Sequence, residues 1–170
     1  MELYEAIKSR YSVRAYQDRP VEQDQLDRIL EAARLAPSGS NRQPWKFIVV
    51  RDAATRQRLV PACRDQAFVG QAPVVIAGVG LMADRVMSCG VPGDPVDLAI
   101  AMEHVALAAT AEGLGTCWVG AFSQDQVCQI LGVPVGCKVI ELMALGYPAA
   151  SPGPKVRKPL AEIVCYEKFA

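Results

Sequence analysis

This 170-residue chain contains a single histidine and no two cysteines in a C-x-x-C spacing. Zinc and iron–sulfur sites are built mainly from such residues, so a metal centre has little support. The six cysteines are scattered along the chain, and we expect reduced thiols that are mostly buried as small apolar residues. His104 falls within an apolar stretch and is predicted to be a core residue rather than a catalyst.

An excess of one charge is also missing, because 18 Lys and Arg residues are balanced by 18 Asp and Glu residues. Proteins that bind nucleic acid or anionic membranes usually carry a basic excess, so neither class is expected. No window approaches the roughly 18 consecutive apolar residues that a membrane span needs. The first ten residues, MELYEAIKSR, carry charge from the second position and contain no apolar run. We therefore expect no secretory signal and a cytoplasmic location.

Apolar residues are abundant, at 51% of the chain, which is high for a chain of average charge. The length suits one domain, and no linker-like segment divides it, so residues 1–170 are predicted to form a single domain. Within that domain, the proline-punctuated residues 151–170 read as a carboxy-terminal arm. The apolar excess indicates an unusually large buried surface, in either a big core or an obligate oligomer interface.

Hydrophobic periodicity predicts alternating helices and strands. Helices are expected at 2–9, 22–35, 53–69 with an interruption at Pro61, 97–115 and 123–133; strands at 46–52, 73–81 and 137–147; and a strand edge or loop at 116–122. The helix from 97 is apolar nearly all round, with Asp97 as its expected N-cap and Gly113 as its expected stop. Such a helix must be covered on every face, which places it in the core or at a dimer interface.

Basic residues alternate near both ends of the chain. In RYSVR, the side chains of Arg10, Ser12 and Arg14 would face one side of an extended segment, and PKVRK places Lys155 and Arg157 two apart. A guanidinium beside an ammonium group suits a phosphate. Each pattern alone is also typical of solvated surface charge. Neither of the usual glycine-rich phosphate loops, G-x-x-x-x-G-K-[ST] or G-x-G-x-x-G, is present.

The helix expected at 22–35 runs into the polar stretch APSGSNRQPW, residues 36–45. A plain connection to the next strand would be shorter, and it would not expose several side chains that donate or accept hydrogen bonds. This loop is therefore a candidate binding segment.

Six stretches together resemble the nitroreductase family of flavin mononucleotide (FMN) enzymes: SRYSVRAY, AARLAPSGSNRQPWKFIVV, QAPVVIAGVG, GLGTCWVGAF, LGVP with ALGYP, and KVRKPLAEIV. They follow the family's order and spacing over essentially the whole chain. The resemblance implies an α+β fold with a central, mostly antiparallel sheet flanked by helices. It also implies an intertwined homodimer with two FMN sites at the subunit interface, which would account for the apolar excess.

The resemblance also implies roles for individual residues. Arg10, Ser12 and Arg14 would contact the flavin, Arg10 at the phosphate and Arg14 towards the pyrimidine edge of the ring. Other expected flavin-binding residues are Lys155 and Arg157 at the phosphate, Ser38, Ser40, Asn41 and Gln43 in a loop that reaches the partner's flavin, and Val119 and Gly120, whose backbone lies against the ring. Trp118 is either a wall of the site or a core residue.

The function implied is an FMN-dependent oxidoreductase. Hydride would pass from NADH or NADPH to the flavin and then, by a ping-pong mechanism, to a nitroaromatic, a quinone or a similar small acceptor. The flavin carries this chemistry, so no side chain is expected to act as nucleophile or general base. Two alternatives remain open: a catalytically idle flavin-binding or sensory protein on the same scaffold, and a nucleotide-binding protein that uses the basic clusters for another phosphate.

Overall fold

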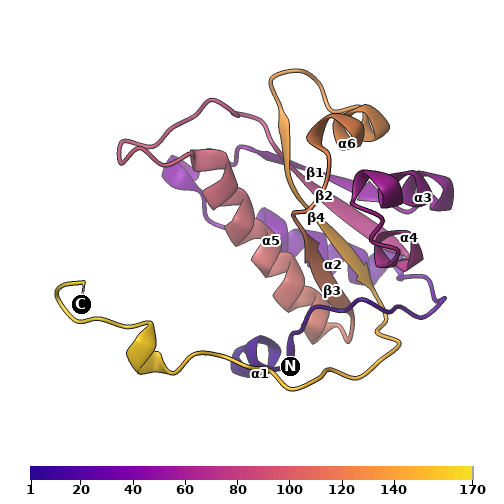
Figure 1. The fold of residues 1–170 in the computed structure, drawn as a ribbon, viewed down its shortest axis with the longest axis horizontal. Helices are drawn as coiled ribbons and strands as arrows, with labels where there is room; N and C mark the ends of the chain where they lie inside the picture. Colours follow the sequence, from indigo (N-terminus) through magenta and orange to yellow (C-terminus); the bar gives the residue numbers. More distant parts are fainter. Residues whose placement is uncertain (170) are drawn as a thin grey trace.

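The computed structural model describes residues 1–169, which form a four-stranded sheet with helices on both faces (Figure 1). The strand order is β1-β2-β4-β3, and all neighbouring strands are antiparallel. The strands are β1 (Trp45–Val50), β2 (Val74–Gly80), β3 (Gly115–Val119) and β4 (Lys138–Gly146). The helices are α1 (Leu3–Ser9), α2 (Gln23–Arg34), α3 (Ala53–Ala62), α4 (Phe68–Gln71), α5 (Gly93–Ala111) and α6 (Gln124–Leu131), with short 3-10 turns η1 (Gly39–Asn41) and η2 (Leu160–Glu162).

The two faces of the sheet bury different sets of side chains, because successive residues of a strand point to opposite faces. Val75, Ala77 and Val79 of β2 pack with the apolar residues of α3, α4 and α6. Val74 and Ile76 of the same strand pack with those of α2 and α5. The chain is thus a three-layer α+β structure, and the predicted fold class is confirmed.

The helices and strands lie close to the segments that periodicity predicts, with two differences. Asp97 is not an N-cap, because α5 begins four residues earlier, at Gly93 after Pro92, and Asp97 lies inside the helix. Pro61 does not interrupt its helix either, since it lies within the last turn of α3. The interruption follows Ala62, where Arg64 and Asp65 take positive φ angles of 57° and 56°. Gly113, with a φ of 77°, follows the end of α5 as expected.

One face of α5 remains uncovered in the single chain. Val96 and Ile100 are exposed, as are Leu3, Tyr4 and Ile7 of α1. Residues 151–169 run away from the body of the molecule as an arm (Figure 1), and the hydrophobic side chains Val156, Leu160, Tyr166 and Phe169 are exposed along it. A soluble chain rarely leaves so many large apolar groups in water, which indicates that a further surface covers them.

The cysteines are less buried than expected. Cys63 and Cys117 are buried, Cys128 and Cys137 are half-buried, and Cys89 and Cys165 are exposed. His104 is half-buried, with its Nδ1 atom 3.1 Å from the carbonyl oxygen of Ala32. Among residues 1–169 no group of three or more His, Cys, Asp or Glu side chains could hold a metal ion. No helix in the same range is long and apolar enough to cross a membrane.

Candidate cofactor site

A groove of about 260 Å³ brings together the two basic segments from opposite ends of the chain. Arg10, Ser12 and Arg14 line one side of it, and Lys155 and Arg157 line the other. The alternation of the first segment explains this geometry: Val13 points inward and is buried, so its neighbours on either side face the groove. The backbone holds the segment in place, since the Val13 N–H donates to the Thr116 carbonyl at 2.9 Å.

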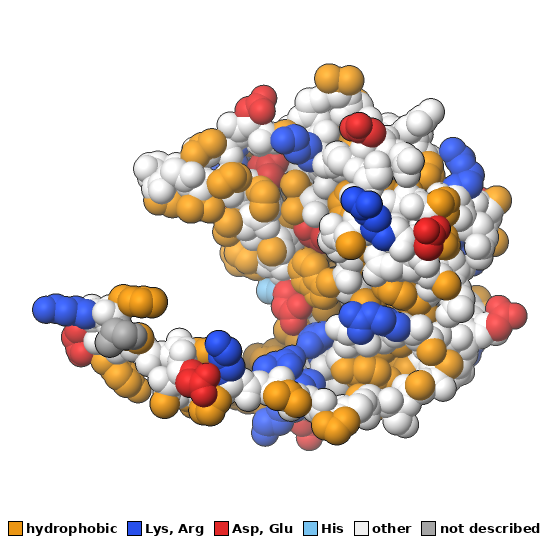
Figure 2. All heavy atoms as spheres, viewed as in Figure 1, with side chains coloured by type: hydrophobic (Ala, Val, Ile, Leu, Met, Phe, Trp, Pro, Cys, Tyr) orange, Lys and Arg blue, Asp and Glu red, His pale blue; other side chains and the backbone are white. Residues whose placement is uncertain are grey.

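Positive charge dominates this groove. Among residues 1–169, the one acid that forms an ion pair with these cations is Glu103 of α5, whose Oε1 lies 3.9 Å from Arg10 Nε, a long contact. Lys155 donates hydrogen bonds to the carbonyl oxygens of Lys8 and Arg10, which ties the arm to the end of α1. Desolvation lowers the pKa of Lys155, and the nearby cations Arg10 and Arg157 lower it further. Figure 2 shows Lys and Arg side chains gathered where the arm leaves the body. Cations held this close together favour a bound anion.

Strand β3 connects the groove to the second predicted contact region. Its Thr116 lies beside Ser12 in a parallel bridge, and the Thr116 hydroxyl is buried with no hydrogen-bond partner among the residues that the structure describes. Val119 is three residues further on, about 10 Å away at the usual rise of a strand, and Gly120 follows it. A Cβ atom built on Gly120 would meet nothing within 4 Å, so the space beside this backbone is open. Trp118 packs against the core between the sheet and α5, which supports its reading as a core residue.

The loop after α2 is strained. Ser40, Asn41 and Gln43 all have φ angles between 50° and 54°, a left-handed conformation that non-glycine residues rarely adopt. Each such residue costs on the order of 1–3 kcal/mol, and such residues cluster at functional sites. The Ser38 hydroxyl accepts a hydrogen bond from the Gln43 N–H at 2.8 Å, and Gln43 Nε2 donates to Asn41 Oδ1 at 3.2 Å. The loop thus holds a fixed shape by its own polar groups.

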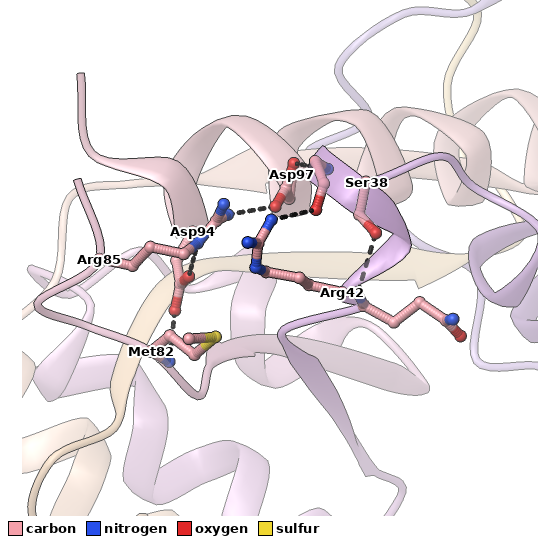
Figure 3. A network of polar contacts seen from close by, with 8 residues as sticks. Ser38, Arg42, Met82, Arg85, Asp94 and Asp97 are labelled. Carbon is pink, nitrogen blue, oxygen red and sulfur yellow. Dashed lines mark hydrogen bonds and ion pairs between the residues drawn. The ribbon is translucent and has the colours of Figure 1, made fainter. Parts of the chain in front are cut away.

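A buried ionic cluster fastens this loop to the rest of the molecule (Figure 3). Arg85 donates to both Asp94 and Asp97, neighbours on one face of α5. Asp97 Oδ1 accepts a hydrogen bond from the Gly39 N–H at 3.0 Å, and Asp94 Oδ2 accepts one from the Met82 N–H at 2.7 Å. The cluster therefore joins the loop at 38–43, the segment at 81–92 and the first turns of α5.

Three glycines make room for that cluster. A Cβ atom on Gly93 would lie 2.3 Å from the guanidinium carbon of Arg85, and one on Gly80 would lie 2.7 Å from Asp94 Oδ2. A Cβ atom on Gly39 would lie 3.3 Å from an Arg85 nitrogen. A side chain at any of these three positions would therefore crowd Arg85 or Asp94.

The model of the Nitroreductase family matches residues 7–82 and 65–147 of this chain. The chain belongs to the nitroreductase family. It is 33% identical to an NADH dehydrogenase of Thermus thermophilus, over 95% of this chain and 94% of that protein. A nitroreductase family protein of Clostridium difficile superimposes with a TM-score of 0.89 at 35% identity, over 99% of this chain and all of the other. An NADPH:FMN oxidoreductase of Vibrio harveyi, solved with NAD+, superimposes with a TM-score of 0.91 at 26% identity, over 99% of this chain and 78% of the other.

The nitroreductase site residues expected from sequence fall into two separate groups. Arg10, Ser12, Arg14, Lys155 and Arg157 share the groove. The loop residues Ser38, Ser40, Asn41 and Gln43 lie elsewhere: among the contacts described for residues 1–169, no hydrogen bond or ion pair joins them to the groove. Val119 and Gly120 are linked to the groove through β3.

The residues present fit an FMN molecule. The groove offers four cationic side chains for a phosphate, Ser12 lines it too, and open space flanks Gly120. Sequence reasoning missed the ionic cluster around Arg85. A signal for it exists, because Asp94 and Asp97 are three apart on one helix with no basic residue one turn away, so their counter-ion has to come from another segment.

Proposed function

We propose that this chain is an FMN-dependent oxidoreductase that takes hydride from NADH or NADPH and delivers it, by a ping-pong mechanism, to a nitroaromatic, a quinone or a similar small acceptor. The observation that carries the proposal is the groove in which Arg10, Ser12 and Arg14 meet Lys155 and Arg157. Four of these five side chains are cationic and come from segments about 145 residues apart, and such a group of guanidinium and ammonium donors suits a phosphate. Family membership supports the same conclusion.

In this proposal the phosphate of FMN lies among Arg10, Lys155 and Arg157, and bound FMN supplies the hydride chemistry. The Arg14 guanidinium lies against the pyrimidine edge, where it opposes the negative charge that develops on reduction. Its carbon lies 6.0 Å from the centroid of the Phe68 ring, and that buried ring limits where Arg14 can move. The backbone of Val119 and Gly120 would direct an N–H toward the ring. In this proposal no side chain needs to act as nucleophile or general base.

The second part of the proposal is an intertwined homodimer in which Ser38, Ser40, Asn41 and Gln43 contact the flavin of the partner. The separation of this loop from the groove supports it, because a loop that does not reach its own chain's groove is available to another. The exposed apolar groups of α1, α5 and the arm supply the surface that a dimer would bury. The proposed location is the cytoplasm, which the scattered thiols support.

The absorbance spectrum of purified protein, before and after anaerobic addition of NADH or NADPH, tests the function. We expect a yellow protein whose flavin bands bleach on reduction and return when a quinone is added. Flavin bands that persist in the presence of both donors would favour an idle flavin-binding protein. A protein that takes up no FMN would contradict the proposal at its first step, and would leave the nucleotide-binding alternative.

A further inference from the structure

A second cationic hollow lies outside the flavin groove, at the edge of the sheet where β1 ends and β2 begins. Its volume is about 230 Å³, and it shares no lining residue with the groove. Three arginines from three segments line it: Arg19 from the stretch before α2, Arg51 directly after β1, and Arg56 from the first turns of α3. The only acidic side chain in its lining is Asp18.

All three arginines are positioned by neutral groups. Arg51 donates to the Gln23 Oε1 atom at 2.8 Å and to the Val21 carbonyl at 2.9 Å. Arg56 donates to the Arg51 carbonyl. Hydrogen bonds to neutral acceptors fix the direction of a guanidinium group but leave its charge uncompensated.

Arg19 is positioned by an aromatic ring. Its guanidinium carbon lies 3.8 Å from the centroid of the Tyr147 ring, and the Tyr147 hydroxyl donates to Gln25 Oε1 at 2.8 Å, which holds that ring in place. A cation over an aromatic face keeps its full charge. In the part of the chain that the structure describes, none of the three arginines has a carboxylate within 4.0 Å.

Arg56 carries the observation that points to a ligand. Its Nε atom is buried and has no hydrogen-bond partner among the described residues. Burial lowers the pKa of Arg56, and the nearby carboxylate of Asp52 opposes that change only in part. A buried, unpaired donor is costly, and in native proteins such groups usually mark the place of a water, an ion or a ligand.

We propose that Arg19, Arg51 and Arg56 form a binding site for a small phosphate-class anion, separate from the flavin site. The chain has no net charge, so three arginines with Asp18 in the lining and Asp52 near Arg56 still form a local excess of positive charge rather than part of a general basic surface. A guanidinium fork matches phosphate oxygens, and three arginines that line a hollow of this size suit a compact, multiply charged anion rather than an extended polymer. The anion would accept hydrogen bonds from guanidinium N–H groups of these three arginines.

The test uses the full-length, FMN-loaded protein and isothermal titration at constant ionic strength. Inorganic phosphate, inorganic pyrophosphate and AMP are titrated in separate arms. We expect saturable binding of one anion per chain. Tighter binding of AMP would identify a nucleoside phosphate as the source of the anion, and equal or weaker binding of AMP would identify the free inorganic anion. Absence of saturable binding in all three arms would overturn the proposal.

Variants assign the binding to this hollow. Arg56→Gln and Arg51→Gln should each weaken anion binding by about ten- to a hundredfold, the usual loss for a charge-assisted hydrogen bond. The matched control is Arg58→Gln, an exposed position of the same helix outside the hollow, and it should bind as wild type does. Arg19→Gln, on a different segment, gives an independent reading if an α3 variant folds poorly.

FMN affinity separates the two sites. Arg56→Gln should leave FMN affinity unchanged, and Arg157→Ala, in the flavin groove, should leave pyrophosphate affinity unchanged. Pyrophosphate binding that survives in Arg19→Gln, Arg51→Gln and Arg56→Gln, or that disappears in Arg157→Ala, would contradict the assignment.

Discussion

Arg157 is exposed at the far side of the flavin groove, and its guanidinium donates a hydrogen bond to the neighbouring Val156 carbonyl at 2.7 Å. Its role therefore does not depend on stabilising the fold, which makes it a suitable probe of ligand binding. In the proposed site it faces the FMN phosphate together with Arg10 and Lys155.

Replacing Arg157 with Ala should weaken FMN binding about ten- to a hundredfold, because one charge-assisted hydrogen bond to the phosphate, worth roughly 1.5–3 kcal/mol, is lost. Riboflavin lacks the phosphate and should bind almost equally to both proteins. Fluorescence titration of the apoprotein measures both affinities. The control is Lys158→Ala, the next basic residue of the arm, which does not line the groove. A riboflavin affinity that falls as far as the FMN affinity would refute the phosphate role.

Glu141 is a buried acid in the middle of β4, with 6% of its surface exposed. It lies opposite Gly78, where a Cβ atom would come within 3.0 Å of its Oε1 atom, and that oxygen has no hydrogen-bond partner among the residues described. Burial raises the pKa of Glu141 from 4.5 to about 7. The folded protein thus holds a proton that the unfolded chain has already released between these two values.

This difference predicts a loss of stability as pH rises. From pH 4.5 to about 7 the folded state binds more protons at Glu141 than the unfolded state, so the free energy of unfolding falls through this range and is then constant. The contribution of Glu141 is on the order of 3 kcal/mol, from the difference between 4.5 and about 7 at about 1.4 kcal/mol for each pH unit. Glu141→Gln should remove it, so wild type and variant should diverge across this range in urea unfolding.

Glu31→Gln is a control in which the pH dependence of stability should change in the opposite direction. A hydrogen bond from Arg34 lowers the pKa of Glu31, so that acid stabilises the fold above its unfolded pKa, and the contribution is lost as pH falls. Parallel pH profiles for wild type and Glu141→Gln would show that folding does not raise the pKa of Glu141.

At the scale of elements, the cluster of Arg85, Asp94 and Asp97 joins two loops to α5. Its three charged groups are largely buried, with side-chain exposures of 13%, 2% and 4%. One cation shared by two carboxylates leaves a net negative charge, so removing the cation leaves two unpaired buried acids that repel each other. A buried ion pair of this kind costs far more to break than it contributes to stability when intact.

Arg85→Met should therefore lower the free energy of unfolding by roughly 3–5 kcal/mol. Asp97→Asn should lower the free energy of unfolding less in the Arg85→Met background than in wild type, because in that background the substitution removes an unpaired buried acid. Urea unfolding of the four proteins forms a double-mutant cycle, and we expect a coupling energy of about 1–3 kcal/mol. Arg34→Met, which breaks an exposed pair with Glu31, is the control and should have a small effect. If the two substitutions change the free energy of unfolding additively, Arg85 and Asp97 are not energetically coupled, and the cluster does not act as one unit.

At the scale of the whole molecule, the proposed site draws on two chains. The groove comes from one chain and the loop with Asn41 from its partner. As homodimers, Arg10→Ala and Asn41→Ala should both bind FMN weakly, because each defect is present at both sites. In a heterodimer of the two variants, one site carries both defects, and the other has an intact Arg10 from one chain and an intact loop from the other.

Co-expressed heterodimers, purified through two different tags and titrated with FMN, should thus recover close to one site of wild-type affinity per dimer. Activity should return to about half if the sites act independently. If the loop served its own chain, each heterodimer site would carry one defect. No site of wild-type affinity would then appear, and the two-chain site would be wrong. Homodimers of each variant, carrying the same tags, are the controls.

Local pattern was sufficient for most of the elements. The apolar spacing of Leu26, Ile29 and Ala33 predicts α2, and those side chains are indeed buried together. The β-branched run of β2 predicts a strand buried on both faces, as found. The alternation of Arg10, Ser12 and Arg14 correctly predicts that they face one groove. These features depend only on the fixed periods of strand and helix, so neighbouring residues contain the information.

Contacts between distant segments were decided by the tertiary structure alone. Asp97 resembles an N-cap in sequence because it precedes an apolar helix, but α5 begins at Gly93 and the carboxylate instead meets Arg85 and the Gly39 N–H. Arg19, Arg51 and Arg56 line one hollow. The sequence does not predict this, because each of them has the pattern of an ordinary surface arginine. A side chain's partner depends on how loops close and how layers pack, and no local period describes either. The chain's own sequence therefore determined its elements, its family and the faces of its basic segments, whereas the fold decided which charges share a site.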